Sequence, residues 1–474
     1  MPTVFARLWI GRAVVTTVLV VGALTSAQAD QSGASGTMKP CQGPYKGKRV
    51  AAAALRSVVD SHSRWLEQRD SANHRRADLC QADLRQAALN GANLERANLE
   101  GAILRQANLY QSTLTQASLA GADLTKAGLE DSNLSGADLR KARLSHANLF
   151  RVVGDEAALF DAALVGTQLH ESTFERAHFE GADLTSADFT NANLADSFFY
   201  GANLHRAVLS GADLLEADLR RTNLTHAVLH KTNLQGALLD GAQLNDARLV
   251  EADLEGAYLD EADLTGASLR DALLRGADLR FTSLQAAGLQ QADLEGVNFE
   301  GARLVKANLQ SANLKMAILY HAVIDEADFR DARLFNAVLI GARGTGAMFA
   351  KADLSDIYAP KASLQKARFN EAKLESANLV SADLRGANLS HALLHHANLQ
   401  EADLRDASLA GADLGAARLD GADLRQANLR GANLARTLGL TQAQIDGACL
   451  DEQTSLPSEL SRPAPCVEKK LKKK

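Results

Sequence analysis

Residues that could do chemistry are frequent in this chain, but their spacing does not assemble them into a site. Ser, His and Asp recur throughout, and such abundance makes chance triads common. The sequence has no Gly-X-Ser-X-Gly elbow, no phosphate-binding loop and no His-Glu-X-X-His motif. His391, His395 and His396 come closest to a metal cluster, yet their spacing places them on a shared edge at best. We expect no enzyme, no cofactor and no metal site, and we interpret these histidines as exposed, variable positions.

A row of Asp and Asn residues, each preceding a leucine, raises the question of calcium, which prefers oxygen ligands. The row is irregular, because the same position holds Asn133 and Asp138 but also Ser118 and Arg143. Short polar side chains at such positions hydrogen-bond locally in turns. We therefore predict turn formation here, not a repeated ligand cage.

These residues belong to a strict five-residue repeat. From Leu79 to Leu434, 72 consecutive fifth positions carry Leu, Phe or Ile, with Gly154, Gly344 and Ala359 as the exceptions. Two residues before each of them lies a small residue, which is Ala in 61 of the 72 units. A short period sustained over most of a chain is the signature of a stacked repeat.

The period excludes the ordinary regular elements. Five residues of α-helix advance about 500°, a net rotation of about 140°, so the leucines would define no common face. In a flat strand, a step of five would place successive leucines on opposite faces. A chain that turns a corner once in every unit directs all leucines and alanines towards one axis, which predicts an all-β solenoid.

The tandem units, such as Ala82-Asp83-Leu84-Arg85-Gln86, resemble the pentapeptide-repeat family over residues 75–435. The resemblance implies a right-handed, quadrilateral β-helix with four units per coil, hence about 18 coils and a rod roughly 86 Å long. Leu204, Leu224 and Leu244 would then stack on one another. Periodicity alone fixes neither the four sides nor the hand.

The regions outside the repeat predict an exported chain with closed ends. Arg7, Arg12, a short apolar run and Ala27-Gln28-Ala29 are typical of a secretory signal, with an uncleaved anchor as the alternative. Thr441 and Gln444 predict a capping box that begins a short helix. The helices at both ends are expected to cap the rod, and dimer contacts are the alternative. The predicted segments are a signal peptide (1–29), a flexible linker (30–49), an N-terminal capping helix (50–74), the β-helix (75–435), a C-terminal cap (436–465) and a basic disordered tail (466–474).

Four cysteines flank the repeat: Cys41, Cys80, Cys449 and Cys466. In an exported chain they can form structural disulfides. Pairing Cys41 with Cys80 and Cys449 with Cys466 would staple the two ends, although four cysteines allow three connectivities.

The charge balance bears on function. Residues 75–435 hold 35 Lys/Arg and 48 Asp/Glu, a net charge of −13. Spread over the rod, this is one net charge per roughly 6.6 Å, whereas duplex DNA carries one per about 1.7 Å. The family resemblance implies one alternative function, a DNA-mimicking inhibitor or protector of a type II topoisomerase.

We predict instead a periplasmic or secreted bacterial scaffold that is structural or binds an unknown protein. No nucleic acid or small-molecule substrate is expected. Membrane contact would come only from the basic tail or an uncleaved signal, and a homodimer is left open.

Overall fold

The computed structural model describes residues 41–68 and 75–463. The chain divides into two units, Met1–Gln42 and Gly43–Lys474, and the whole repeat belongs to the second. The predicted signal (1–29) and basic tail (466–474) lie outside the described residues. Within the described ranges, no helix has the length and apolar composition needed to cross a membrane.

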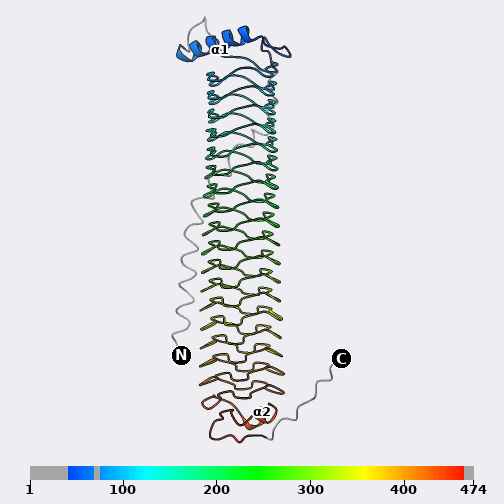
Figure 1. The fold of residues 1–474 in the computed structure, drawn as a ribbon, viewed down its shortest axis with the longest axis vertical. Coiled ribbons are helices and arrows are strands. Elements are labelled where there is room, and N and C mark those ends of the chain that lie inside the picture. The colour runs from blue at the N-terminus through cyan, green and yellow to red at the C-terminus, as the bar shows by residue number, and fades with distance from the viewer. Residues whose placement is uncertain (1–40, 69–74, 464–474) are drawn as a thin grey trace, which may run out of the picture. The chain divides into compact units, whose positions relative to one another are not determined.

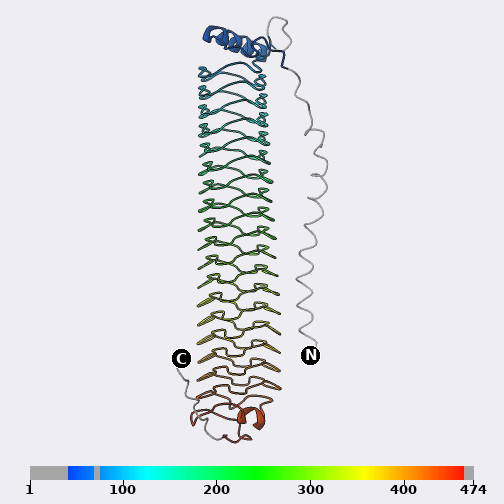
Figure 2. The same ribbon diagram turned by 90° about the vertical axis from the view of Figure 1, so that its right-hand side faces the viewer.

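The repeat forms a straight stack of coils (Figures 1 and 2). Isolated parallel bridges join residues twenty positions apart along the whole repeat, as in Asp78–Asn98, Asn98–Ser118 and Ser118–Asp138. Each unit contributes one bridging residue, so the described residues contain no strand longer than a single residue. A period of twenty residues with a turn every five gives a coil with four sides.

In the unit from Ser132 to Gly136, where Asn precedes the core leucine, every backbone N–H has a defined acceptor. The amide of Ser132 closes the preceding turn on the carbonyl of Leu129 (3.0 Å), and Asn133 donates to the coil before (3.0 Å). Leu134 and Gly136 donate to the coil after, at 2.6 and 2.9 Å. The remaining amide, of Ser135, donates to the side-chain oxygen of Asn133 at 2.9 Å. The predicted turn bonding by Asp and Asn is therefore confirmed.

Each corner is a β-turn whose third residue has a positive φ. In the turn from Leu84 to Ala87, Gln86 has a φ of 59°, and the Ala87 amide donates to the Leu84 carbonyl at 3.0 Å. Glycine tolerates this conformation best, and Gly91 holds it in the next turn with a φ of 66°. The turn bends the chain from one side of the coil to the next and directs the next leucine inward.

The interior is filled by the leucine and alanine columns. Leu204, Leu224 and Leu244 are fully buried, as are Ala207 and Ala227. Burial of each leucine side chain contributes about 1.5–3 kcal/mol. Eight phenylalanines also point inward, and four of them, Phe174, Phe179, Phe189 and Phe199, pack edge to face or in parallel, with the ring centres of Phe179 and Phe199 4.7 Å apart. The filled core leaves only the outer surface for binding.

The two glycines at core positions are compensated by large neighbours. A Cβ atom placed on Gly154 would lie 2.1 Å from Cε1 of Phe174, one coil away. A Cβ on Gly344 would lie 2.8 Å from Cγ1 of Ile324 and 3.1 Å from Cδ2 of Leu364. Neighbouring side chains thus occupy the space that the missing leucines would fill, and the bridges continue unbroken past both glycines.

The segment before the repeat is more ordered than its composition predicts. Part of the region assigned to a flexible linker (30–49) pairs with the first coil: Gly47 donates to Gln81 at 2.8 Å, Asp83 donates to Lys48 at 2.9 Å, and Arg49 bridges Asp83. The linker prediction is therefore wrong for residues 47–49. The physical reason is that the first coil leaves an edge of unpaired backbone groups, and this segment supplies their partners.

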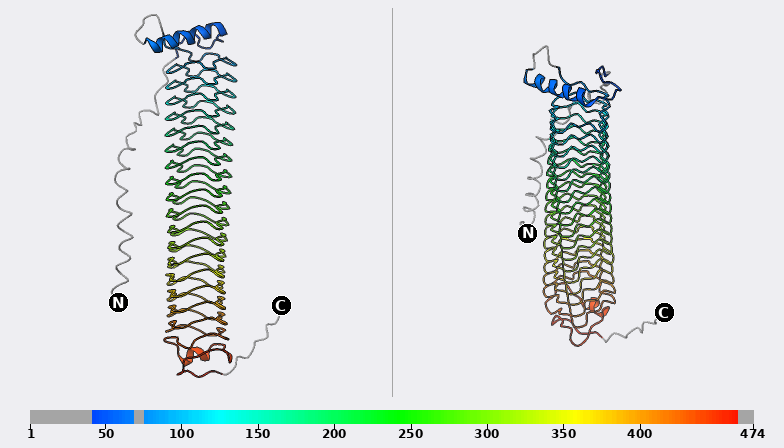
Figure 3. Two further views of the ribbon diagram at one scale, coloured as in Figure 1. Left: turned by 60° about the vertical axis from the view of Figure 1, so that its left-hand side comes forward. Right: turned by 45° about the horizontal axis from the view of Figure 1, so that its top comes forward.

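The helix α1 (Ala52–Glu67) lies across the same end of the stack, within the predicted span of 50–74 (Figure 3). Its Leu55 and His62 are buried. The Nδ1 atom of His62 accepts from the Ala77 amide at 3.1 Å, which leaves Nε2 to donate to the Glu95 carbonyl at 2.9 Å. The imidazole therefore joins the helix to two points of the first coil, and burial lowers the pKa of His62.

At the other end, a short helix α2 (Gln442–Asp446) begins with the predicted capping box of Thr441 and Gln444, which is confirmed. The Nε2 atom of Gln444 also donates to the carbonyls of Leu419 and Ala422, at 2.8 and 2.9 Å. Cys449 and Ser455 bridge the last regular units at Asn428 and Asn433. An irregular turn of chain thus pairs with the final coil.

The compensation at Gly154 gives a testable prediction. Gly154→Leu should destabilise the protein by roughly 1–3 kcal/mol through overpacking, and Phe174→Leu by a similar amount through an unfilled space. The double variant restores the ordinary leucine stack, so it should be more stable than either single variant, with a coupling free energy of about 2 kcal/mol.

Urea denaturation followed by circular dichroism measures these differences. Gly288→Leu is a suitable control, because Gly288 faces outward and only the flexible side chain of Gln290 lies near its added Cβ. A double variant as unstable as the sum of the singles would contradict the compensation.

Candidate functional site

The four sides of the coil can be compared once each unit is assigned to its column. Each side is taken as the bridging residue, the core residue and the two turn residues after it, repeated every twenty positions. Each side is located by its column of core residues and named for its outward residues. The aromatic side has the core column Leu79, Leu99 and so on to Leu419, and the ladder side has Leu84 to Leu424. The plain side has Leu89 to Leu429, and the acidic side has Leu94 to Leu434.

Charge is unevenly divided among these sides over residues 75–435. The acidic side carries 15 Asp/Glu and 6 Lys/Arg, a net charge of −9. The aromatic side carries 13 Asp/Glu and 7 Lys/Arg, a net charge of −6. The plain side carries 9 Asp/Glu and 8 Lys/Arg, and the ladder side carries 11 Asp/Glu and 12 Lys/Arg. The negative charge of the rod thus resides on two adjacent sides, while the other two are close to neutral.

Aromatic residues are also concentrated on one side. Ten aromatic side chains of residues 75–435 face outward, and seven of them are on the aromatic side: Phe160, Phe198, Tyr200, Tyr258, Phe281, Tyr320 and Tyr358. His178 lies between Phe160 and Phe198, with ring centres at 4.9 and 4.7 Å. The aromatic side therefore offers flat rings to solvent in several coils between residues 158 and 361.

Six apolar residues in three consecutive coils form the largest group on this side, here called the apolar patch. Ile318, Tyr320 and Tyr358 are 39%, 37% and 45% exposed. The bridges Ile318–Val338 and Val338–Tyr358 stack Ile318, Val338 and Tyr358 in one column. The complete patch is Ile318, Tyr320, Val338, Ile340, Tyr358 and Pro360, with no acidic residue on the aromatic side in these coils.

The four coils before the patch make an acidic stretch on the same side. It holds Asp240, Asp260, Glu261, Asp278 and Glu300, against the single cation Arg280, which is bound to Asp278 at 2.7 Å. The other four carboxylates form no ion pair within the described residues. Burial raises the pKa of Asp240, and the neighbouring charge of Asp260 raises it further. One carboxylate oxygen of Asp260 is buried without a hydrogen-bond partner in the described structure.

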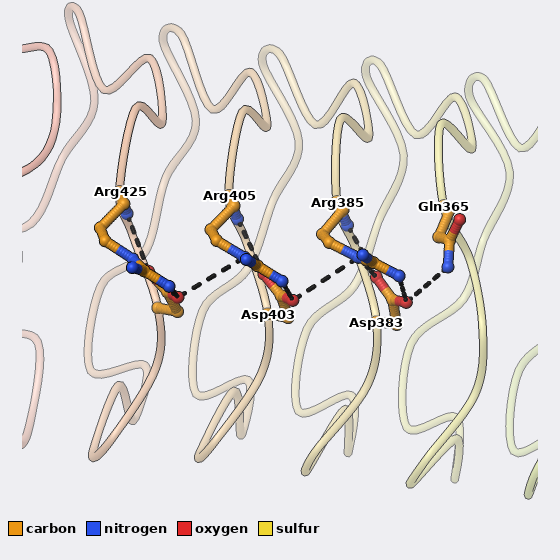
Figure 4. Close-up of polar contacts among 7 residues, drawn as sticks. Gln365, Asp383, Arg385, Asp403, Arg405 and Arg425 are labelled. Carbon is orange, nitrogen blue, oxygen red and sulfur yellow. Dashed lines mark hydrogen bonds and ion pairs between the residues drawn. The ribbon is translucent and has the colours of Figure 1, made fainter.

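The ladder side shows the opposite electrostatic arrangement (Figure 4). Asp383, Asp403 and Asp423 each accept a bidentate hydrogen bond from the arginine two residues later; for Arg405 the distances are 2.8 and 2.6 Å. Arg385 and Arg405 also reach the next aspartate in the row, both at 3.6 Å. The hydrogen-bonded guanidinium group of Arg405 lowers the pKa of Asp403. The row is thus neutralised internally and offers little unpaired charge.

A shallow, open depression near the first coils of the ladder side is lined by four cations: Arg49, Arg85, Arg105 and Lys126. Arg85 is already bound to Asp83, and Arg105 to Asp123. The depression contains neither a nucleophile with an adjacent base nor paired acids, so the arrangement provides no catalytic constellation.

The cysteines and histidines singled out in the sequence belong neither to the apolar patch nor to the acidic stretch. Cys41, Cys80 and Cys449 are each disulfide-bonded, and Cys466 lies outside the described residues; the predicted pairings stay a prediction. His391 and His396 sit at turns with φ of 59°, and His395 binds Asp413 at 2.7 Å. In the described part of the chain, no three His, Cys, Asp or Glu residues are placed to hold a metal ion.

The sequence reasoning missed the apolar patch and the acidic stretch as a combined feature. The net charge of residues 75–435 was considered as a whole and not side by side. The sequence does contain a pattern that reveals the apolar patch, because writing it in rows of twenty residues aligns Ile318, Val338 and Tyr358 in one column.

A family model described as "Pentapeptide repeats" matches more than three quarters of the chain. The matches cover residues 70–153, 162–319, 327–358 and 361–452. No curated protein matches.

Among solved structures, HetL is a pentapeptide repeat protein involved in heterocyst differentiation regulation from the cyanobacterium Nostoc sp. strain PCC 7120. It is 30% identical over 53% of this chain and 90% of its own, with a TM-score of 0.23. A trypsin-treated form of QnrB1, a plasmid-mediated fluoroquinolone resistance protein, is 22% identical over 41% of this chain and 90% of its own, with a TM-score of 0.25. Rfr23 from the cyanobacterium Cyanothece 51142 is 24% identical over 30% and 85%, with a TM-score of 0.14.

We expect the carboxylates of Asp240 and Asp403 to affect the stability of the fold in opposite directions, because the pKa of Asp240 is raised and that of Asp403 is lowered. The pKa of Asp240 is raised in the folded state, so its ionised form destabilises the fold at neutral pH. Asp240→Asn should therefore stabilise the protein at pH 7, by under about 1 kcal/mol for a partly exposed group. This gain should vanish as the pH falls through the raised pKa towards the ordinary value of about 3.9.

Asp403→Asn is the matched control. Arg405 lowers the pKa of Asp403, so its contribution is present above the ordinary aspartate pKa and is lost as the pH falls through the lowered value. This variant should be slightly less stable than the parent at pH 7. Denaturation midpoints at pH 7 and pH 3 test both, and a destabilised Asp240→Asn protein at pH 7 would refute the assignment.

Proposed function

The chain belongs to the pentapeptide-repeat family, and from this premise we propose that it is an exported, non-catalytic scaffold whose outer sides bind a protein. Members of this family form right-handed, quadrilateral β-helices, and the twenty-residue bridge period is consistent with that form. The proposal includes about 18 coils over roughly 86 Å. It also assigns α1 and the segment after Leu434 as caps for the two ends.

One observation carries the interaction role: the outward residues differ systematically from side to side, although the inward residues are nearly constant. A purely structural spacer needs only solubility from its surface. In this chain, aromatic rings gather on one side, net negative charge lies on that side and on the adjacent acidic side, and charges on the ladder side neutralise each other. Contiguous exposed apolar groups of this kind mark interaction sites.

Two features support export. Residues 1–29 have the pattern of a secretory signal. Cys41, Cys80 and Cys449 are disulfide-bonded, and disulfides persist in oxidising compartments such as the periplasm. We propose the pairings Cys41–Cys80 and Cys449–Cys466, which peptide mapping without reduction would assign directly.

The export proposal predicts that residues 1–35, fused to a reporter enzyme that is active only outside the cytoplasm, will give an active reporter. The same fusion lacking Ala13–Leu24 removes the apolar run and should be inactive. Equal activity of the two fusions, or retention of both in the cytoplasm, would contradict export and would favour an intracellular role.

The alternative function is mimicry of DNA towards a type II topoisomerase. The acidic and aromatic sides together carry a net −15, which is one charge per roughly 5.7 Å of the proposed rod, against about 1.7 Å for a duplex. This density is about a third of that of DNA, so we place the scaffold function first. We expect the purified mature protein to leave DNA supercoiling by gyrase unchanged, and inhibition or protection at micromolar protein would reverse this order.

A further inference from the structure

Building on the proposed scaffold function, we propose that the aromatic side between Leu238 and Lys361 docks a protein segment with a matching composition. That segment presents an apolar cluster to the apolar patch, and lysine or arginine residues to the acidic stretch. The direction of binding is defined, because the basic end of the partner must point towards the N-terminal end of the stack.

The apolar half of this surface rests on the composition of the patch. Tyrosine and aliphatic side chains exposed together resemble the centre of a protein interface, where aromatic residues are enriched and charges are depleted. Tyr320 and Tyr358 are partly exposed rings that stand two coils apart. The backbone below them is fixed by bridges on both sides, so the partner meets a preformed surface and orders few side chains on binding.

The charged half rests on the acidic stretch. The bridges Tyr258–Asp278, Asp278–Asn298 and Asn298–Ile318 make it continuous with the patch along one column. Its five carboxylates and one arginine give a net −4, and Asp240, Asp260 and Glu300 have no cation bound in the described residues. A basic segment would neutralise these charges, which favours both specificity and fast association.

The same features disfavour other occupants. A second copy held by the patch alone would contact only three coils, about 10 Å along the axis, whereas stable interfaces bury about 800 Å² per partner. Sliding the copies to enlarge the contact would set the patch against the acidic stretch of the other copy and desolvate unpaired carboxylates. Anionic lipid would be repelled by the acidic stretch.

The binding probe is a fluorescent synthetic peptide with a block of lysines followed by a block of leucine and phenylalanine. Fluorescence anisotropy should show that Ile318→Ser combined with Tyr358→Ser weakens its binding at least tenfold. Asp240→Asn combined with Asp260→Asn should weaken it several-fold and flatten its salt dependence. The matched control, Val208→Ser with Val228→Ser on the plain side, should bind as the parent does. Circular dichroism and thermal melting confirm that each variant is folded.

Two further peptides complete the test, one with glutamates in place of the lysines and one with the same residues interspersed. Both should bind at least tenfold more weakly than the block peptide. Equal affinity for all three peptides, or an unchanged affinity of the patch variant for the block peptide, would overturn the proposal.

Photocrosslinking in the native cell separates this proposal from the scaffold function itself. A photoreactive phenylalanine replaces Tyr358 on the aromatic side or Tyr110 on the plain side, which is the control. A partner crosslinked from Tyr358 through a basic, apolar segment supports the proposal. Protein crosslinks from Tyr110 alone, or crosslinks from Tyr358 only to a second copy or to lipid, overturn it. Failure of probes on all four sides, with Val305 on the ladder side and Phe335 on the acidic side replaced in the same way, to crosslink any protein would instead refute the scaffold function.

Discussion

The structure depends on the hydrogen bonds that the backbone amides of each unit make within the unit and to the adjacent coils. Three amides, those of Asn133, Leu134 and Gly136 in the unit described above, need an adjacent coil, one closes a turn, and one needs a side-chain oxygen. A single coil cannot meet these needs, so coils stabilise each other in series and the ends require added segments. His62 and Gln444, whose side chains bond to the first and last coils, meet that requirement at the two ends.

This requirement separates the residues that maintain the fold from those that vary. The leucine and alanine positions fill the interior, and Asp or Asn before the leucine satisfies the turn, so these types recur. The two turn residues and any remaining bridging residues face outward, and most of them are exchangeable without loss of a backbone bond. Differences among the sides therefore report on binding more than on folding, as with Tyr320 and Tyr358 on one side and the Asp403–Arg405 pair on another.

The sequence predicts the repeating part of this protein well because one local rule operates 72 times. The inward direction of Leu224 and the turn bonding of Asn133 follow from period and chemistry alone. Contacts that occur once are harder to predict. The pairing of Gly47 with Gln81 depends on an open edge, and the filling of space at Gly154 by Phe174 depends on knowing that these residues stack. The candidate surface needed the same knowledge, since its columns emerge only at a period of twenty.

The contrast between two rows of carboxylates bears on the proposal that the aromatic side binds a partner. On the ladder side, Asp383 and Asp403 are separated by one coil, and arginines bind both of them. On the aromatic side, Asp240 and Asp260 have the same separation, yet neither forms an ion pair in the described structure, and the pKa of Asp240 is raised. Stacked like charges of this kind oppose folding. This repeat pairs an outward aspartate with an arginine in either order, as in Asp403–Arg405 and Arg418–Asp420, and Asp420 holds the same place in its unit as Asp240. The unpaired carboxylates are therefore not imposed by the backbone. Their retention beside the apolar patch is the expected result where a partner supplies the missing cations.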